Sequence, residues 1–410
     1  MALNYVWVAF FLVAFVVALL RVLLFGDTAV FGDMVQSTFD MAKVSVDIAI
    51  YLIGVITLWQ GIMKVGEEGG AVNYLTRLVG PFFNKLFPGV PKDHPAVGAM
   101  IMNFSANMLG LDNAATPLGL KAMNELQSLN KEEDTASDAM IMFIVLNTSG
   151  LTLVPVSVMA IRAAQGAANP ADIFLPILLA TYFATLGGLI TVAIKQRINL
   201  FQPVLLAWLG GFTAGIAALL FYLNGLEQET VNTISNAAGN GIIMFIIVAF
   251  FALAILKRVN VYETFIDGAK DGFSISIKII PYLVAMLVAI GVFRASGALD
   301  YLVDGIAAFL RLFLADTRFV DALPTALMKP LSGSGARGMM VEQMNTFGAD
   351  SFVGRLACVF QGSTETTFYT LAVYFGAVSI RKTRYALGTG LIADLCGIIA
   401  AIVIAYIFFG

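Results

Sequence analysis

The sequence predicts an all-α polytopic membrane protein with two inverted repeats, whose broken helices and re-entrant hairpins meet near the bilayer midplane. Hydrophobic residues make up 59% and charged residues 12% of the 410 positions, whereas soluble domains carry roughly 25% charged residues. Two polar runs interrupt apolar segments, NTSGLTLVP at 147–155 and QGSTETTFY at 361–369. Unsatisfied backbone and ionised groups are costly in hydrocarbon, so such runs persist only where they face protein or a wet cavity.

Composition argues against several classes of function. The formal net charge is -3 and no basic block occurs, which gives no basis for nucleic-acid binding. The only histidine is His94, and no clustered ligand spacing for zinc or iron occurs, so neither a metal nor a cofactor is predicted. Cys358 and Cys396 lie in apolar segments and are most simply packing residues, with a disulfide or a reactive thiol as the alternative. No nucleophile–base pair is recognisable, so we expect the protein not to be an enzyme.

The start of the chain predicts two crossings and an interfacial helix. A transmembrane helix needs roughly 20 apolar residues, and the segments 4–25 and 44–65 meet that requirement. A short acidic connection is expected between them, at 27–40. In 71–89 leucine, valine and phenylalanine recur at helical spacing opposite two basic residues, which is typical of an amphipathic helix in the membrane interface.

The next apolar stretch, 95–126, predicts a re-entrant hairpin, because two half-length apolar pieces flank a centre rich in Gly, Asn, Asp and Pro. A kinked ordinary helix is the alternative. His94, at the base of this hairpin, is expected to cap a helix rather than to titrate. A solvated loop at 131–138 leads to a helix that is broken at 147–155. Further crossings are predicted at 172–194, 200–223 and 239–256.

The chain then repeats itself. GGAVNYLTRLVGPFFNKLF at 69–87 aligns without gaps with SGALDYLVDGIAAFLRLFL at 296–314, a shift of 227 positions. The polar runs at 147–155 and 361–369 are related by a shift of 214 positions. We interpret the pattern as a duplication, in which a longer first hairpin and its acidic loop account for the different shifts.

The second copy is expected to repeat the order of span, interfacial helix, hairpin, broken helix and span. These elements are predicted at 272–293, 298–314, 323–344, 352–377 and 385–409. The duplication divides the chain into a first repeat, a connecting transmembrane helix with an outer loop, and a second repeat. Their predicted bounds are 1–199, 200–237 and 238–410.

Lysine and arginine placement predicts the orientation. If the broken helices cross the membrane and the hairpins do not, most basic residues fall on one side, which is then cytoplasmic. The opposite side holds connections such as NGLEQET at 224–230, which has no basic residue. About nine spans result, with the N-terminus inside and the C-terminus outside. The single span between the repeats makes them antiparallel, and inverted repeats with discontinuous helices are the architecture of secondary transporters.

The second polar run carries the leading candidate, Glu365. The break at Gly362-Ser363-Thr364 would expose N–H groups at the start of a half-helix, whose positive end favours an anion, and Glu365 is expected in its first turn. There it would bind a substrate donor, a coupling cation or a proton, unless it merely caps its own half-helix. The candidate binding residues of this run are Gln361, Ser363, Thr364, Glu365 and Thr366.

The first polar run supplies neutral candidates, which are Asn147, Thr148, Ser149 and Thr152. They would contact a substrate or ion, or else form hydrogen bonds between packed helices. The two hairpin tips would close the site with Asp112, Asn113, Thr116, Ser332, Ser334 and Arg337. Arg337 would neutralise Glu365 or meet an anionic group, unless it snorkels to the outer interface. Asp394 in the last span would be a proton or ion site, or else a polar packing partner.

Several of these segments resemble a known family. HPAVGAMIMNFSANMLGLDNAATPLGLKAM and NTSGLTLVP resemble the spore maturation A proteins, and LMKPLSGSGARG and QGSTETTFYTLAVYFGAV resemble the spore maturation B proteins. Both groups belong to the nucleoside-recognition, or gate, family, so the chain resembles a natural fusion of the two. That family is distantly similar to the concentrative nucleoside transporters, which implies their fold. Residues 113–118 are loosely similar to the Gln-Thr-Glu-Ala-Pro-Leu hairpin motif of those transporters, with Ala115 in place of its glutamate.

Together these features predict a multi-pass protein of the bacterial inner (cytoplasmic) membrane. It would act as a secondary transporter or flippase that moves a small polar or amphiphilic solute, nucleoside-like or a cell-envelope metabolite, by alternating access. Its partners would be that small molecule and the lipid bilayer, not nucleic acid. Coupling to a proton or a sodium ion and assembly into a homo-oligomer are left open. The alternative is a non-transporting membrane scaffold or regulator of envelope or spore maturation that binds a ligand or a protein partner.

Overall fold

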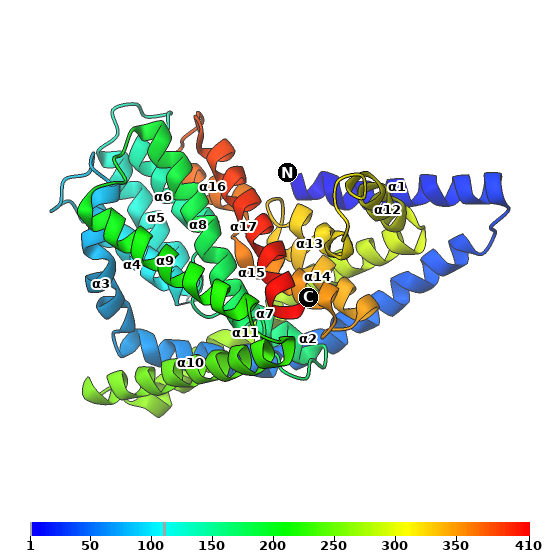
Figure 1. Ribbon diagram of the computed structural model, residues 1–410, viewed down its shortest axis with the longest axis horizontal. Coiled ribbons are helices and arrows are strands. Elements are labelled where there is room, and N and C mark those ends of the chain that lie inside the picture. The colour runs from blue at the N-terminus through cyan, green and yellow to red at the C-terminus, as the bar shows by residue number, and fades with distance from the viewer. Residues whose placement is uncertain (1, 110–111) are drawn as a thin grey trace. The chain divides into compact units, whose positions relative to one another are not determined.

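The computed structural model describes residues 2–109 and 112–410, and these residues form helices joined by loops, without a β-strand (Figure 1). The prediction of an all-α protein is therefore confirmed. Among the described residues, six helices are long and apolar enough to cross a membrane, or seven if a pair of helices bent by 70° counts as one span. This number is consistent with a polytopic membrane protein, and the nine spans expected from the sequence stay a prediction.

The helices follow one another in an order that recurs. The first series is α1 (Ala2–Phe25), α2 (Val30–Glu68), α3 (Ala71–Leu86), α4 (Pro95–Met108), α5 (Asp112–Ser128), α6 (Asp138–Ser149), α7 (Val156–Ala164) and α8 (Phe174–Gln196). After α9 (Pro203–Asn224) come α10 (Gln228–Leu256), α11 (Val261–Ala295), α12 (Ala298–Leu310), η1 (Arg318–Ala322), α13 (Leu323–Met328), α14 (Gly333–Phe347), α15 (Phe352–Ser363), α16 (Thr367–Ala377) and α17 (Ala386–Phe409).

The predicted hairpins and broken helices appear at the expected places in the chain. Helices α4 and α5 pack against each other, as do α13 and α14. The two halves of a single kinked helix would instead continue away from each other. His94 caps α4 by accepting a hydrogen bond from the N–H of Ala96 at its ring Nδ1 over 3.2 Å, as the sequence suggested. The insertion of the hairpins into the membrane stays a prediction.

Three long helices begin earlier than the sequence suggested. Helix α2 starts at Val30 rather than near 44, α10 at Gln228 rather than near 239, and α11 at Val261 rather than near 272. The expected acidic connection is therefore mostly helical. The physical reason is that its charged residues and Gln36 fall three or four positions apart, so that they all lie on one helix face. These positions in α2 are Asp33, Gln36, Asp40, Lys43 and Asp47.

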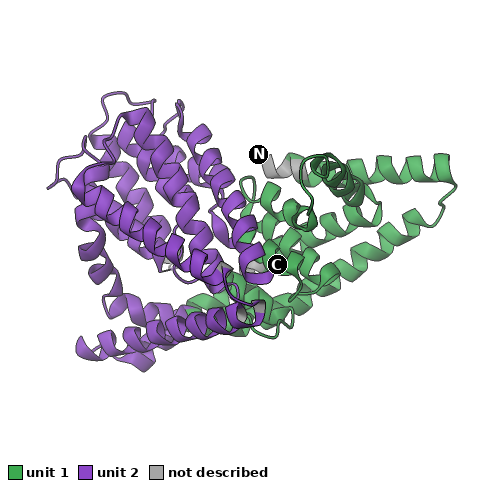
Figure 2. Cartoon of the chain, in the orientation of Figure 1, with its two compact units in different colours: residues 1–59, 157–170, 269–361 green, residues 60–156, 171–268, 362–410 purple. Residues whose placement is uncertain are grey.

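The chain folds into two compact units (Figure 2). Unit 1 consists of residues 1–59, 157–170 and 269–361, and unit 2 consists of residues 60–156, 171–268 and 362–410. Each unit thus takes segments from both halves of the sequence. Unit 1 holds the hairpin of the second half together with α1 and α7, and unit 2 holds the hairpin of the first half together with α10 and α16.

The core of unit 2 joins several of its helices. Its buried residues include Phe83, Met100 and Phe143, which bring α3, α4 and α6 together. In unit 1, α1 and the start of α2 pack on the end of α11 and the start of α12 through Ala14, Val30 and their neighbours. Both cores consist of aliphatic and aromatic side chains, whose close van der Waals packing holds helices together inside a membrane.

Helices α2 and α11 approach each other closely at one point in each unit. In unit 2 a Cβ on Gly268 would lie 2.5 Å from both the carbonyl oxygen of Gln60 and the Cβ of Lys64. In unit 1 a Cβ on Gly291 would lie 2.5 Å from the Cγ of Met41. At Gly268 the absence of a Cβ lets the two backbones come close, whereas at Gly291 it leaves room for side chains of α2.

Candidate functional site

In unit 2 the two polar runs lie against each other where their helices break. The first half-helix, α6, ends at Ser149, and the chain continues without helical structure from Gly150 to Pro155. The second break lies between α15 and α16. The N–H of Glu365 donates a hydrogen bond of 2.8 Å to the carbonyl oxygen of Thr148, so the backbones of the two breaks are joined directly.

The local sequence explains why each helix stops there. Gly150 caps α6 with φ +51°, a left-handed conformation that suits glycine, and Pro155 lacks the N–H that would continue a helix through it. In the second break Thr366 takes an extended conformation and serves as the N-cap of α16. Serine and threonine favour such positions because their side chains compete with the helix for backbone hydrogen bonds.

Glu365 lies one residue before that N-cap, not in the first turn of the half-helix, so this part of the expectation was wrong. The helix begins later than expected because Thr366, not an earlier residue, adopts the extended capping conformation. The side chain of Glu365 is exposed within unit 2, and its Cγ would lie 2.9 Å from a Cβ placed on Gly150. A carboxylate is therefore held directly over the break of the other helix.

The tip of the first hairpin is tied to the same place. The N–H of Leu153 donates to the carbonyl oxygen of Met108, at the end of α4, over 2.7 Å. Asn107 donates from its Nδ2 to the Oδ1 of Asn147 over 2.8 Å. The side chain of Asn147 is buried and its Nδ2 donates to the carbonyl oxygen of Phe143 over 2.9 Å. Asn147, a neutral residue of the first polar run, is thus engaged in a network between helices.

Three residues that the sequence did not single out as site residues extend this network. The Nδ2 of Asn103 donates to the carbonyl oxygen of Ala115 over 2.8 Å and lies 3.4 Å from the hydroxyl oxygen of Tyr374. That hydroxyl lies 3.5 Å from the Oδ1 of Asn147. Asn103 and Asn107 are four positions apart on α4 and so share a face, a signal that was available in the sequence. Tyr374 carried no such signal, because its partners are more than two hundred positions away.

Helix α17 packs against the second break through glycine residues. A Cβ on Gly390 would lie 2.9 Å from the Cγ2 of Thr367, and one on Gly397 would lie 2.9 Å from the Cγ2 of Thr364. Asp394, between them, is buried and accepts a hydrogen bond of 2.7 Å from the Oγ1 of Thr367. The glycines allow α17 to reach the backbone of the second break, and Asp394 is held at the start of α16.

Three of the remaining hydroxyl candidates of unit 2 bind their own backbone. Thr148 donates to the carbonyl oxygen of Val145, Ser149 to that of Leu146 and Thr152 to that of Gly150. Thr366 is buried, makes no side-chain capping bond, and so stands at the break with its helix N-terminus uncapped. Ser363 and Thr364 are buried beside it, and Thr116 is half-buried on α5.

The second hairpin belongs to unit 1. Ser332 caps α14 by accepting a hydrogen bond of 3.0 Å from the N–H of Gly335, and its hydroxyl oxygen lies 3.2 Å from that of Ser334. The Nε of Arg337 and the Oε1 of Gln361 are buried without a hydrogen bond to any residue that the structure describes. The expected pairing of Arg337 with Glu365 joins residues of different units and stays a prediction. The side chains of Asp112 and Asn113 lie outside the described part of the chain.

What the site can do follows from its atoms. Backbone carbonyl groups at the end of α6, backbone N–H groups at the start of α16, and the carboxylates of Glu365 and Asp394 offer both acceptors and donors. Within the described residues no three histidine, cysteine or acidic side chains form a group that could hold a metal ion. The arrangement can therefore both donate hydrogen bonds to a polar group and accept them from one.

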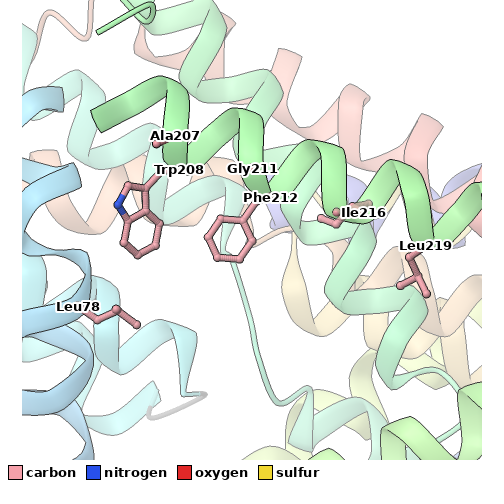
Figure 3. A pocket seen from close by; sticks show the side chains of 8 residues that line it. Leu78, Ala207, Trp208, Gly211, Phe212, Ile216 and Leu219 are labelled. Carbon is pink, nitrogen blue, oxygen red and sulfur yellow. The ribbon is translucent and has the colours of Figure 1, made fainter. Parts of the chain in front are cut away.

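An apolar groove of about 590 Å³ lies elsewhere in unit 2, between α3 and α9 (Figure 3). Figure 3 shows the rings of Trp208 and Phe212 on the side of α9 that faces Leu78. The lining is almost wholly hydrocarbon, so this groove supplies few groups that would select a polar solute. It is not the candidate site.

Comparison with known proteins agrees with the resemblance seen in the sequence. The family Gate, described as nucleoside recognition, matches residues 49–165 and 276–381, which together exceed half of the chain. Spore maturation protein B of Bacillus subtilis (strain 168) is 46% identical over 184 residues, which are 45% of this chain and 99% of that protein. Spore maturation protein A of the same organism is 39% identical over 187 residues, 46% of this chain and 92% of that protein. No solved structure matches the chain.

Proposed function

We propose, from the premise that this chain belongs to the nucleoside recognition family Gate, that it is a secondary transporter or flippase of the bacterial inner membrane. It would move a small polar or amphiphilic solute, nucleoside-like or a cell-envelope metabolite, by alternating access. The observation that carries the proposal is the hydrogen bond of 2.8 Å between the N–H of Glu365 and the carbonyl oxygen of Thr148. Two helix breaks in contact inside an apolar bundle are how secondary transporters present backbone groups to a solute or ion.

The recurrence of local features supports two inverted repeats. Gly70 and Gly297, separated by the shift of 227 positions, both take left-handed conformations, with φ 87° and 84°, immediately before α3 and α12. Helices α6 and α15 each have 12 residues, and their bounds differ by the shift of 214 positions. Repeats with these features would be joined by α9 alone, which inverts the second copy.

The close contacts of α2 and α11 obey the same relation. The shift of 227 positions relates Met41 to Gly268 and Lys64 to Gly291. It therefore exchanges the contact between Gly268 and Lys64 for the contact between Met41 and Gly291. A duplicated chain with a two-fold axis would produce this exchange. We infer a concentrative-nucleoside-transporter-like fold with about nine spans, the N-terminus inside and the C-terminus outside.

In this mechanism Glu365 binds a donor group of the solute or a coupling cation, and the N-terminus of α16 binds an acceptor group. The carbonyl groups at the end of α6 and the Asp394 carboxylate would hold a coupling proton or sodium ion. Arg337 and the serines of the second hairpin would meet an anionic part of the solute when the hairpins close.

The experiment that tests the proposal is uptake into proteoliposomes or whole cells, with nucleosides, cell-wall fragments and small anions as candidate solutes. We expect flux of at least one solute, and Glu365→Gln should reduce it at least tenfold without changing the melting temperature of the purified protein. Glu132→Gln is the matched control, because Glu132 is an exposed carboxylate in a loop and should transport normally. Absence of flux for every solute, or full activity of E365Q at low and high pH, would reject the proposed mechanism.

A membrane scaffold or regulator is the second candidate. The names of both relatives refer to spore maturation rather than to transport. Such a protein would keep the contact between the breaks and bind a ligand or a protein partner without moving it. Solute binding to the purified protein that is saturable, together with no flux in proteoliposomes, would favour this reading.

A further inference from the structure

A second buried carboxylate lies in unit 1, away from the helix breaks. Glu342 of α14 has an exposed fraction of 4%. Its Oε1 lies 2.6 Å from the Nε of Arg294, at the end of α11, and accepts a hydrogen bond of 2.8 Å from the Oγ1 of Thr346. Its Oε2 is buried and has no hydrogen bond to any described residue. One oxygen of this carboxylate is therefore paired while the other is desolvated, which is costly for a charged group.

The charged groups around Glu342 come from each neighbouring element. Helix α12 contributes Asp300 and Asp304, η1 contributes Asp321 and also Arg318, which pairs with Asp316, and Arg311 follows α12. Helix α13 has no titratable side chain. Of these groups, Arg294 and Asp300 act on the charge of Glu342, whereas Asp304 and Arg311 act on the charge of Asp321. Asp300 therefore adds negative charge near a buried carboxylate that is paired with Arg294, and this negative charge favours the binding of a proton.

The proton fits this position better than a metal ion does. The described residues hold no group of three or more acidic, histidine or cysteine ligands that suits a metal. The free Oε2 of Glu342 can take a proton without any movement of the Arg294 side chain, because Arg294 and Thr346 both contact Oε1.

We propose that Glu342 is a proton-binding site. A proton on Oε2 neutralises the carboxylate, whereas the ion pair with Arg294 keeps the carboxylate ionised, so the two compete. Protonation leaves a neutral acid in place of a buried charge and frees the Arg294 guanidinium to interact with the acidic residues of α12 and η1. This inference does not depend on transport, and it would hold equally for a scaffold protein.

The direction of the local pKa values agrees with this reading, for groups outside the candidate spans. Burial raises the pKa of Glu342 above its ordinary 4.5, and Arg294 opposes that rise. Burial, and next the charge of Asp304, raise the pKa of Asp321. A carboxyl group with a raised pKa binds more protons in the folded state than in the unfolded state. Its contribution to stability is therefore fully present below pH 4.5 and is lost as the pH rises through the raised pKa.

Thermal unfolding of the purified full-length chain between about pH 8 and about pH 4 tests the proposal directly. We expect the melting temperature of the wild-type protein to rise on acidification relative to that of Glu342→Gln, which carries a permanently neutral side chain. Arg294→Gln should move the midpoint of the wild-type rise to higher pH, because the carboxylate loses the cation that holds it ionised. Glu132→Gln, which removes an exposed carboxylate of the same type, should behave as the wild type.

Two results would overturn the site. The first is a pH dependence in E342Q equal to that of the wild type, which would mean that the proton binds elsewhere. The second is an unchanged midpoint in R294Q, which would mean that Arg294 and the proton do not compete. If E342Q does not fold, R294Q decides alone. Because no flux is measured, failure here and failure of the transport proposal are separate outcomes.

Discussion

Arg162 has the largest fully buried side chain among the described residues. It lies near the end of α7, in unit 1, and donates from Nη1 to the carbonyl oxygen of Ala349 over 2.6 Å. Its Nη2 lies 2.9 Å from the Oδ1 of Asp350, whose other oxygen accepts from the N–H of Ala168. A single guanidinium therefore fixes the turn before α15 to the segment that follows α7.

Replacing Arg162 should be costly for stability. Arg162→Met would leave the buried carbonyl of Ala349 and part of Asp350 without a donor, and we expect a loss of about 2–3 kcal/mol. The estimate stays below the cost of a wholly buried pair because the side chain of Asp350 is 37% exposed. Arg318→Met is the control, since Arg318 is 54% exposed and pairs with Asp316 in water, where such a pair contributes about 0.2–1 kcal/mol.

Denaturant or thermal unfolding of the two purified variants distinguishes the cases. Equal losses of unfolding free energy in R162M and R318M would contradict a structural role for the buried guanidinium. The sequence alone could not have identified Arg162, which stands in an apolar stretch and looks like a residue that snorkels to the membrane surface. Only the fold brings Ala349 and Asp350, almost two hundred positions further on, to its side chain.

At the scale of the elements, the contact between the two breaks depends on Gly150. Its φ of +51° costs a residue with a Cβ roughly 1–2 kcal/mol. A Cβ there would also lie 2.9 Å from the Cγ of Glu365, closer than carbon atoms pack. Gly150→Ala should therefore lose more stability than the conformation alone explains, and it should displace Glu365.

Gly166→Ala provides the matched comparison. Gly166 also has a positive φ, of 74°, but a Cβ there would have no atom within 4 Å. We expect the loss of unfolding free energy in G150A to exceed that in G166A by about 1 kcal/mol or more, the usual minimum for overpacking a close contact. If the two variants are equally stable, Gly150 and Glu365 are not in close contact.

A second element-scale feature joins the loop before α6 to the loop after α16. The N–H groups of Arg381 and Lys382 both donate to the carbonyl oxygen of Asp134 over 2.9 Å, and that of Ala136 donates to the carbonyl oxygen of Lys382 over 3.0 Å. The Nζ of Lys382 lies 3.2 Å from a carboxylate oxygen of Asp134. The Thr135 hydroxyl and then the Lys382 ammonium lower the pKa of Asp134 below its ordinary 3.8.

The lowered pKa predicts a pH dependence of this contact. A carboxylate with a lowered pKa stabilises the folded state above pH 3.8. This contribution to stability is lost as the pH falls through the lowered pKa. We expect hydrogen exchange at the N–H of Ala136, corrected for the intrinsic rate, to accelerate below about pH 3.8 in the wild type. In Asp134→Asn the corrected exchange rate of the Ala136 N–H should stay constant over the same pH range. A wild-type rate that does not depend on pH would show that the backbone bonds alone hold the loops.

The sequence predicted these elements unevenly, for physical reasons. Breaks such as 147–155 could be predicted because glycine, proline and hydroxyl residues stand where hydrocarbon tolerates none. The start of α2 was missed because a polar stripe on one helix face has the same composition as a loop. The position of Glu365 was missed by a small margin because either Thr364 or Thr366 could have been the cap, and only the backbone conformation decides.

At the scale of the whole molecule, the two units are assembled from both halves of the sequence. Helix α2 passes from unit 1 into unit 2 after Trp59, and α11 passes in the reverse direction after Gly268. No pattern of hydrophobicity marks these points, because both lie inside continuous helices. The local order of the elements could therefore be derived from the sequence, whereas the partition of those elements between units required the fold.

The inversion of the repeats can be tested by labelling equivalent positions from one side of the membrane. Helices α8 and α17 close the first and second series, and Lys195 and Gly410 are exposed residues at their ends. If one helix, α9, joins two copies of the same order, the two ends must lie on opposite sides, with Lys195 in the cytoplasm. In a background with Cys358→Ala and Cys396→Ala, an impermeant maleimide should label Gly410→Cys in intact cells and Lys195→Cys only after permeabilisation. A parallel duplication would give the same response at both positions, because an even number of crossings would then separate them. Labelling of both cysteines from outside would therefore reject the inverted fold, and with it the opposed helix breaks on which alternating access depends.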